Sequence, residues 1–392
     1  MITQKVGLIL FAAGPGRTSI EQLVGRARLA ATRDLVEMAL ACPLVERVVV
    51  ATGAPELVEQ LPADSRLAVE LDPPGEPFHF GQRLAAIIDR YCIRWPLYFG
   101  GGSAPLLAPE SLHELCEDLL AATGRVIANN LRSADFFGFS PPEAIYRIAL
   151  PADQDNTVPY LLSRQAGLRA EALEPAIENC FDLDTPADLM VLRLLEQTKR
   201  HLRRYLDDVA LDAGRVEAVL PQLVSAAADV ALIGRVDTAI WGAASPDSPA
   251  VKRLYVEERS LKALGRDARG EVRSLIGCLF EAVGPAALFA SLASLATAVF
   301  FDTRVLFHHL RLQLSAHDRY ASDLGEVDAI RDPTAREFTA AALACPVPVI
   351  LGGRNVVAGG LWALTQEAWN RVDAGLLAAA SPAAPARQPP LV

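Results

Sequence analysis

Apolar and polar positions alternate in blocks along the first 200 residues, and these blocks predict strands followed by helices. The apolar runs at residues 5–13 and 45–53 end at glycine, which is typical of buried strands that lead into a turn. Further strands are predicted at residues 66–72, 95–101, 124–130 and 134–140. Helical spacing is found at residues 32–42, 80–92, 109–122, 156–167 and 181–197. The alternation predicts an N-terminal α/β domain, residues 1–198, with three αβα layers and a mostly parallel sheet.

The second half has a different pattern and predicts a helix-rich C-terminal α/β domain of unknown role, residues 215–379. Its helices are expected at residues 212–230, 284–301 and 334–345, and its strands at 252–258 and 347–353. Residues 199–214 are the predicted linker, and the basic cluster at 199–205 is expected to end the preceding helix, where cations suit the helix dipole. Residues 380–392 form a Pro/Ala tail that is expected to be disordered.

Composition narrows the class of protein. With 51% hydrophobic and 21% charged residues the chain can bury large cores, and a net charge of −10 argues against a nucleic-acid partner. The six cysteines are scattered, as in a cytoplasmic protein with reduced thiols, and residues 1–10 predict a strand and not a signal peptide. The uncharged run 284–301 is shorter than the roughly 20 residues that span a bilayer, so it is expected to be a buried helix and not a membrane contact.

Two stretches with glycine turns follow predicted strands and could bind phosphate. Residues 12–19 contain Gly14 and Gly16, whose backbone can approach a ligand, followed by Arg17 with its fork of donors. A third glycine and an acidic ribose ligand are missing, so a dinucleotide site of the Rossmann type is not favoured. The second stretch is the corner at residues 100–107, which reads GGGSAPLL.

Charged residues gather in two other stretches. Arg26, Arg28 and Arg33 lie ahead of or early in a predicted helix, where they could neutralise a triphosphate or form a solvated helix face. Asp182 and Asp184 are two residues apart in extended chain, so their side chains point to the same side and could bind one hard cation. Capping of the following helix explains Asp184 but not Asp182.

The ordered set of these stretches resembles nucleotidyltransferases of the nucleotide-diphospho-sugar transferase, or GT-A-like, fold. It is most similar to the molybdenum-cofactor nucleotidyltransferase and 2-phospho-L-lactate guanylyltransferase branches. Residues 8–17 stand where that family has its Gly-rich nucleotide loop, and residues 26–30, RARLA, resemble its Lys-Ser-Arg-Leu segment. Residues 100–107 resemble Gly-Asp-x-Pro-Leu-Leu, and residues 181–189, FDLDTPADL, match Asp-Ile-Asp-Thr-Pro-x-Asp-Leu. The resemblance covers residues 5–198.

The resemblance implies an Mg²⁺-dependent transfer of a nucleotide from an NTP to a small phosphorylated or hydroxylated acceptor, with release of pyrophosphate. It implies catalytic roles for Arg17, Arg26 and Arg28, and metal ligands at Asp182 and Asp184. Nucleotide contacts are expected from Ala13, Gly14, Gly16, Arg17, Gly81, Gly102 and Ser103. Acceptor contacts are expected from Asn129 and Asn130, and whether the protein forms a homodimer stays open.

The chain departs from the family pattern at the corner, because Ser103 or Ala104 stands where the family has a metal-binding aspartate. A neutral hydroxyl is a poorer Mg²⁺ ligand than a carboxylate. Two alternatives to the transferase therefore remain. One is a catalytically silent protein that binds a nucleotide or sugar phosphate, or acts as a scaffold. The other is a glycosyltransferase that uses a nucleotide sugar.

Overall fold

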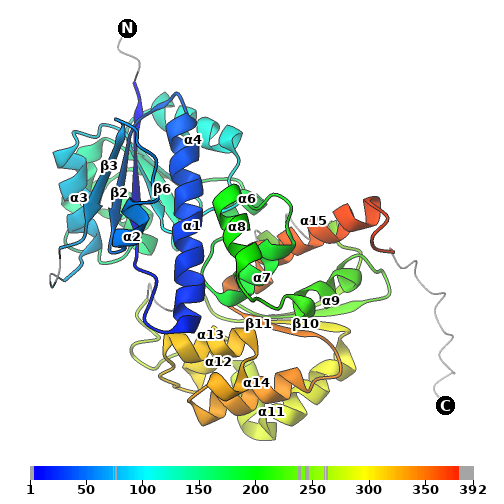
Figure 1. Cartoon of the computed structure of the whole chain (residues 1–392). Coiled ribbons are helices and arrows are strands. Elements are labelled where there is room, and N and C mark those ends of the chain that lie inside the picture. Colours follow the sequence, from blue (N-terminus) through cyan, green and yellow to red (C-terminus); the bar gives the residue numbers. More distant parts are fainter. Residues whose placement is uncertain are drawn as a thin grey trace, which may run out of the picture. The chain divides into compact units, whose positions relative to one another are not determined.

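The computed structural model describes residues 4–73, 75, 77–236, 240–242, 247–259, 261 and 264–378. The chain, coloured along its sequence in Figure 1, divides into two compact units. Unit 1 comprises Met1–Asp184, Gln197–Ala210 and Ser260–Arg269, and unit 2 comprises Thr185–Glu196, Leu211–Arg259 and Gly270–Val392. The chain thus passes between the units several times, whereas the sequence predicts one boundary near residues 198–215. The predicted tail, residues 380–392, lies outside the described residues.

Unit 1 is built on a seven-stranded sheet with the order β3-β2-β1-β4-β6-β5-β7. Its strands are β1 (Val6–Ala12), β2 (Val45–Thr52), β3 (Leu67–Leu71), β4 (Pro96–Gly100), β5 (Arg125–Ala128), β6 (Phe136–Ser140) and β7 (Arg169–Ala172). β6 runs antiparallel to β4 and β5, and the other pairs are parallel. The predicted α/β class with a mostly parallel sheet is therefore confirmed.

Helices cover both faces of this sheet and bury two separate cores, because successive side chains of each strand point to opposite faces. Leu8 and Leu10 of β1 pack with α1 and α4, whereas Ile9 packs with α3 and α5 on the other face (Figure 1). The helices of unit 1 are α1 (Ser19–Ala41), α2 (Pro55–Val58), α3 (Phe80–Arg90), α4 (Pro109–Ala121), η1 (Pro142–Arg147), η2 (Asp155–Thr157), α5 (Val158–Ala166), α6 (Ile177–Cys180) and α8 (Arg200–Asp208). This arrangement confirms the three layers.

Helix α1 begins well before the helix that apolar spacing predicts at residue 32. Thr18 caps it, because the Thr18 hydroxyl accepts from the Glu21 N–H (3.2 Å) and the Glu21 carboxylate accepts from the Thr18 N–H (3.2 Å). This reciprocal capping box has a sequence signature, Thr-x-x-Glu, that marks the true start. The arginines at positions 26, 28 and 33 consequently lie inside the helix and not ahead of it.

The prediction that the basic cluster 199–205 ends the preceding helix is wrong. Helix α7 (Pro186–Leu194) stops before the cluster, and Arg200 begins the separate helix α8. The positive end of a helix dipole favours an anion, and Asp34 of α1 supplies one. Its two carboxylate oxygens accept from the N–H groups of His201 (2.8 Å) and Leu202 (2.9 Å).

Replacing Asp34 by alanine is expected to lower the free energy of unfolding by about 2 kcal/mol, the upper end for loss of a helix cap. The carboxylate is buried and caps two N–H groups, which would be left without these acceptors. Asp34→Asn is the matched control, since it keeps one acceptor oxygen and should lose less. Urea denaturation of the three proteins measures the difference, and equal stability of Asp34→Ala and the parent would contradict the capping role.

Unit 2 contains a four-stranded, all-parallel sheet with the order β11-β10-β8-β9. The strands are β8 (Asp229–Gly234), β9 (Val251–Val256), β10 (Ala298–Asp302) and β11 (Val349–Gly352). The helices are α7, α9 (Gly214–Leu223), α11 (Leu275–Leu295), α12 (Arg304–His309), α13 (Ala316–Leu324), η4 (Val327–Ala329), α14 (Pro333–Leu343), η5 (Arg354–Val357) and α15 (Gly359–Asp373). A helix-rich α/β unit is thus confirmed.

The prediction of one buried helix over residues 284–301 is wrong, because this run contains the end of α11 and the strand β10. Among the described residues, α11 is a helix long and apolar enough to cross a membrane by length and composition alone, which is weak evidence of a membrane span. Its backbone is non-helical at Gly284 (φ 77°, ψ 170°), where two shorter helices meet before Pro285. The solvent side of the first segment exposes Leu275 and Leu279.

A buried network of charges joins the carboxyl ends of β8 and β10 in unit 2. Arg235 contacts Asp302 through two bonds, Nε to Oδ2 at 2.6 Å and Nη2 to Oδ1 at 3.0 Å. Arg304 contacts Asp323 in the same two-pronged way, at 2.7 and 3.3 Å. Burial disfavours ionisation of Asp302, but Arg235 and then Arg304 outweigh it and hold its pKa below the ordinary value. Burial is also the largest effect on Asp323 and raises its pKa in spite of Arg304. Both carboxylates have no exposed side-chain surface.

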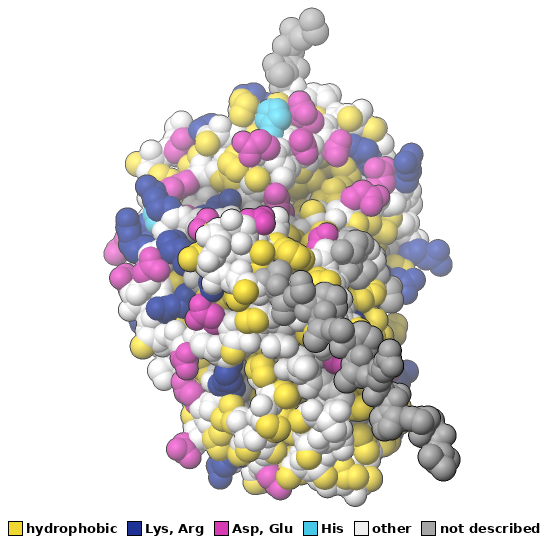
Figure 2. All heavy atoms as spheres, turned by 90° about the vertical axis from the view of Figure 1, so that its right-hand side faces the viewer, with side chains coloured by type: hydrophobic (Ala, Val, Ile, Leu, Met, Phe, Trp, Pro, Cys, Tyr) yellow, Lys and Arg dark blue, Asp and Glu magenta, His cyan; other side chains and the backbone are white. Residues whose placement is uncertain are grey.

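The face drawn in Figure 2 intersperses acidic and basic side chains. Among the described residues on that face, arginine and lysine side chains do not merge into one continuous basic surface. This distribution agrees with the net charge of −10.

Candidate functional site

The carboxyl ends of β1 and β4 lie side by side because these strands are parallel neighbours. The Gly101 N–H donates to the Phe11 carbonyl (2.7 Å), and the Gly53 N–H after β2 donates to the Ala12 carbonyl (3.3 Å). The glycine loop 13–18 and the corner 100–104 therefore start from adjacent points on one sheet edge. This is the edge at which ligands bind in open α/β sheets.

The Asp182–Asp184 loop completes this edge. Ser103 and Asp182 form an isolated antiparallel bridge, and the Leu183 N–H donates to the Gly102 carbonyl (3.2 Å). Two stretches that are 80 residues apart in the sequence thus meet backbone to backbone. The structure brings together Gly102, Ser103, Asp182 and Asp184.

Arg28 holds the loop from the side of α1. Its Nε donates to the Leu183 carbonyl (2.7 Å), and its Nη2 pairs with Asp184 Oδ1 (2.6 Å). Gly102 has a positive φ of 96°, and a Cβ there would lie 2.8 Å from Arg28 Cγ. A glycine is needed at this position because a side chain would collide with the arginine as it crosses the corner.

The other arginines are placed differently. Arg26 is two residues from Arg28, about 200° around the helix. It donates to Gln22 one turn earlier (3.2 Å), and its charge acts on Tyr205 of α8. Arg33 donates to Gln60 (3.0 Å). Arg28 is therefore the arginine of α1 that contacts the Asp182–Asp184 loop, and the predicted catalytic role of Arg26 stays a prediction.

The glycine loop offers fewer donors than its sequence suggests. Ala13, Gly14 and Gly16 are exposed, and so is Arg17. The N–H groups of Arg17 and Thr18, however, both donate to the Glu21 carboxylate (2.8 and 3.2 Å). A phosphate would therefore be met by the exposed backbone at residues 13–16 and by the Arg17 side chain.

Three predicted contact residues serve the fold in this structure. The Gly81 N–H donates to the Ala152 carbonyl (2.8 Å), and a Cβ at Gly81 would lie 2.5 Å from the Ala149 oxygen. The Asn129 amide makes four hydrogen bonds, donating to Asp135 Oδ2 and Asn179 O and accepting from two N–H groups. Asn130 accepts from the N–H groups of Arg132 and Ser133 within the same turn. That these residues contact a nucleotide or an acceptor stays a prediction. Their hydrogen bonds and packing within the protein do not favour it.

Two acidic residues that sequence reasoning missed lie at the corner, Asp135 through its backbone carbonyl and Asp155 through its carboxylate. The Ser103 hydroxyl donates to the Asp135 carbonyl (2.9 Å), and Tyr98 of β4 donates to Asp155 Oδ2 (3.1 Å). A Cβ at Gly100 would lie 2.9 Å from Ser103 Oγ and 3.5 Å from Asp155 Oδ2. Ser103, which stands where the family pattern has an aspartate, therefore has two acidic residues close to it in space.

The electrostatics confirm that the corner is negative. Burial raises the pKa of Asp155, and the charge of Asp184 adds to this rise, against the Asn156 N–H and the Tyr98 hydroxyl. Burial also raises the pKa of Tyr98 well above its ordinary value. The negative charges of Asp155, Asp135 and Asp182 raise it further. A cation placed here would reduce the repulsion among these carboxylates.

The raised pKa of Asp155 predicts a dependence of stability on pH. Folding favours the protonated form, so this carboxyl costs stability progressively as the pH rises from its ordinary value of 3.8 through the folded value. Asp155→Asn removes the ionisation, so its melting temperature should rise relative to the parent as the pH is raised from about 4 to 7. Asp153→Asn, a change at a more exposed neighbour, is the control. A difference that stays constant over this pH range would contradict the prediction.

The donor set suits a hard divalent cation. Carboxylate and hydroxyl oxygens are preferred by Mg²⁺, which takes one or two protein carboxylates and fills its octahedron with water and substrate phosphates. Among the described residues, no three acidic side chains at this corner bring their oxygens within the spacing of one ion. The corner therefore fits a cation whose remaining ligands come from a bound nucleotide, and Asp182 is joined to Ser103 by a backbone bridge.

Known structures are similar to about half of this chain. They include a cytidylyltransferase from Leptospira borgpetersenii serovar Hardjo-bovis, with 16% identity over 53% of this chain and 99% of that one and a TM-score of 0.38. CMP:2-keto-3-deoxy-manno-octonic acid synthetase in complex with CTP has 12% identity over 45% of this chain and 93% of that one, with a TM-score of 0.33. The manganese complex of Rv0371c from Mycobacterium tuberculosis H37Rv has 20% identity over 53% of this chain and 100% of that one, with a TM-score of 0.32. No family model matches the chain, and no curated protein does.

Proposed function

We propose that unit 1 is a nucleotidyltransferase that moves a nucleotide from an NTP to a small phosphorylated or hydroxylated acceptor and releases pyrophosphate. The supporting observation is the meeting of the glycine loop, the Gly102–Ser103 corner, Arg28 and the Asp182–Asp184 loop at one sheet edge. Such a reaction needs mainly positioning of the phosphates and neutralisation of their charge.

The proposed roles follow from the contacts. The exposed backbone at Ala13–Gly16 and the Arg17 side chain meet the phosphates. Asp182 binds Mg²⁺, which neutralises charge on the phosphates when it is bound. Arg28 acts as a positioning residue, because it already pairs with Asp184 and holds the Leu183 carbonyl.

Pyrophosphate release tests the activity. The purified full chain is incubated with each NTP, Mg²⁺ and a panel of sugar phosphates, phosphorylated acids and alcohols. The expected result is release for one NTP that depends on both Mg²⁺ and one acceptor. Absence of release with every NTP, in protein that binds an NTP, would contradict the transferase.

A silent nucleotide-binding protein is the second candidate, and one observation favours it. Ser103 offers no charge, and Arg28 already neutralises Asp184 at 2.6 Å. An internal guanidinium could therefore take the place of the metal ion. This reading predicts NTP binding that calorimetry finds unchanged when EDTA replaces Mg²⁺, whereas the transferase predicts weaker binding.

A further inference from the structure

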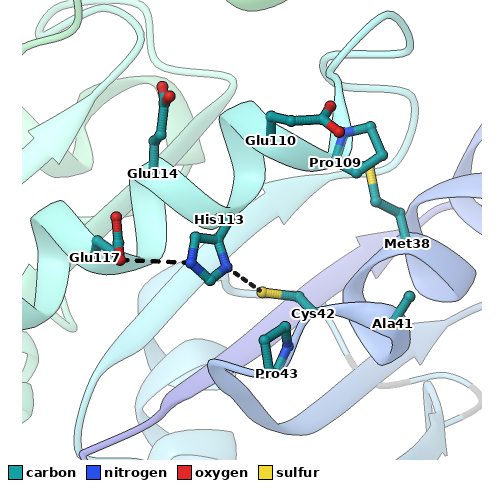
Figure 3. Close-up of a pocket in the computed structure, with 9 residues that line it drawn as sticks. All are labelled: Met38, Ala41, Cys42, Pro43, Pro109, Glu110, His113, Glu114 and Glu117. Atoms are coloured by element: carbon teal, nitrogen blue, oxygen red, sulfur yellow. Dashed lines mark hydrogen bonds and ion pairs between the residues drawn. The ribbon is translucent and has the colours of Figure 1, made fainter.

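A cavity of about 610 Å³ lies in unit 1 between the end of α1 and the start of α4 (Figure 3). Its wall includes the carboxylates of Glu110, Glu114 and Glu117, the imidazole of His113 and the thiol of Cys42. None of the nine described residues that line it is a lysine or an arginine. The charge of the wall therefore favours a cation over an anion.

The thiol lies at the C-terminal end of a helix. Cys42 is the C-cap of α1, and its N–H donates to the carbonyls of Met38 (3.1 Å) and Ala39 (3.2 Å). The last carbonyls of a helix carry partial negative charge, which favours a bound cation. Cys42 is 7% exposed, so little water reaches the sulfur except through the cavity.

The imidazole presents a lone pair to the same point. His113 Nε2 faces Glu117 Oε1 at 3.5 Å, and a carboxylate at this nitrogen keeps the ring proton there. Nδ1 is then unprotonated and faces Cys42 Sγ at 3.9 Å, as Figure 3 shows. Zinc bonds of about 2.3 Å to sulfur and 2.0–2.1 Å to nitrogen in a tetrahedral site separate the two atoms by about 3.6 Å. A small side-chain movement is enough to reach this spacing.

A second cluster, in unit 2, groups three ligand atoms, but its histidine carries the ring proton on the nitrogen that faces the cluster. Cys278, Glu281 and His309 bring their ligand atoms within 4.8 Å of one another. His309 Nδ1, however, accepts from the Ser274 N–H (3.0 Å), so the ring proton is on Nε2, 3.3 Å from Glu281 Oε2. The nitrogen that faces this cluster therefore has no lone pair for a metal.

We infer that the cavity in unit 1 binds a borderline-soft divalent cation of the zinc class through Cys42 Sγ and His113 Nδ1. Water or a cavity carboxylate fills the remaining positions, since thiolate and imidazole together select this class of ion. Binding breaks the S–H bond of Cys42, forms the metal–sulfur bond and releases one proton to solvent, while His113 donates its lone pair without losing a proton. Affinity should therefore fall as the pH is lowered. The titratable groups of α4 that face Cys42 are His113 and Cys116, and burial and the contact with Cys42 raise the pKa of the Cys116 thiol. This site is independent of the proposed nucleotide site.

Cobalt is the probe, because a Co²⁺–thiolate bond absorbs in the near ultraviolet. Tag-free full-length protein is stripped with EDTA, desalted and titrated with Co²⁺. The expected band saturates at one equivalent, is displaced by Zn²⁺ and persists in excess Mg²⁺. Cys42→Ser should abolish it, and Glu117→Gln should weaken Co²⁺ binding about tenfold, the smaller end for loss of a group that orients a ligand.

Exposed cysteines provide the matched controls. Cys92→Ser and Cys278→Ser should leave the band and the affinity unchanged, since both thiols are exposed and neither lines the cavity. His113→Gln, a change at a half-exposed position, tests the imidazole even if Cys42→Ser fails to fold. The inference is overturned if no sulfur band forms, if the band survives Cys42→Ser or is lost in Cys278→Ser, or if His113→Gln binds as tightly as the parent.

Discussion

Replacing Arg304 by methionine is expected to lower the free energy of unfolding of unit 2 by about 3–5 kcal/mol, the range for breaking a buried ion pair. Asp323, with no exposed side-chain surface, would be left buried without the guanidinium that now contacts both of its oxygens. Burial already raises the pKa of Asp323, and loss of Arg304 would raise it further. Burial opposes the charge on Arg304, but Asp323 and Asp302 outweigh it and hold its pKa above the ordinary value.

The double variant Arg304→Met/Asp323→Leu should recover most of the loss, because it removes both charges and fills the space with apolar groups. Arg253→Met is the control, since the Arg253–Asp229 pair is partly exposed and should contribute at most about 1 kcal/mol. Urea denaturation in a Trp95→Phe background confines tryptophan fluorescence to Trp241, Trp362 and Trp369 of unit 2. A double variant no more stable than Arg304→Met would contradict this account.

Asp182→Asn is expected to lower kcat/KM for pyrophosphate release by about 100- to 1,000-fold, if the proposed activity is found. The change removes the negative charge that a cation requires but keeps the size of the side chain. The bridge between Ser103 and Asp182 is formed by the backbone and should survive. The melting temperature without metal should therefore change little.

Asp184→Asn is the informative partner of this variant. In the structure Asp184 is 61% exposed and paired with Arg28, so its loss should weaken the hold on the loop and cost less activity than the loss of Asp182. Steady-state kinetics over a range of Mg²⁺ concentrations separate the two, because only Asp182→Asn should raise the Mg²⁺ requirement strongly. Equal effects of the two variants on that requirement would place the cation between both carboxylates.

The sequence predicts strands well where apolar runs end at glycine. It does not predict strands whose apolar pattern is too short or is continuous with that of a neighbouring helix. β7, with the sequence RAEA, has only four residues and alternates charge with alanine, and Glu171 pairs with Arg125 of the neighbouring strand. β10 follows α11 in one uncharged run, in which apolar periodicity cannot separate a helix from a strand.

The candidate site divides in a similar way. Motif order places Ser103 and Asp182 in one candidate site, and the structure joins the two by a backbone bridge. Motif order does not predict Asp155, which begins η2 more than 50 residues after β4 and contacts Tyr98 of that strand. It also does not show that the Asn129 amide is fully hydrogen-bonded, since one of its four bonds goes to the Asn179 carbonyl, which approaches only in the folded chain.

Because the chain passes repeatedly between the two units, few truncated fragments would contain one complete unit. A fragment of residues 1–198 would carry α7, whose residues Pro186–Leu192 are all buried and which belongs to unit 2, where Ala187 packs against Gly352. The same fragment would lack α8, so Asp34 would be left without the two N–H groups that it caps. Such a fragment would expose an apolar helix and a buried carboxylate at once. Truncation for expression should therefore remove unit 2 by internal deletion and keep residues 197–210.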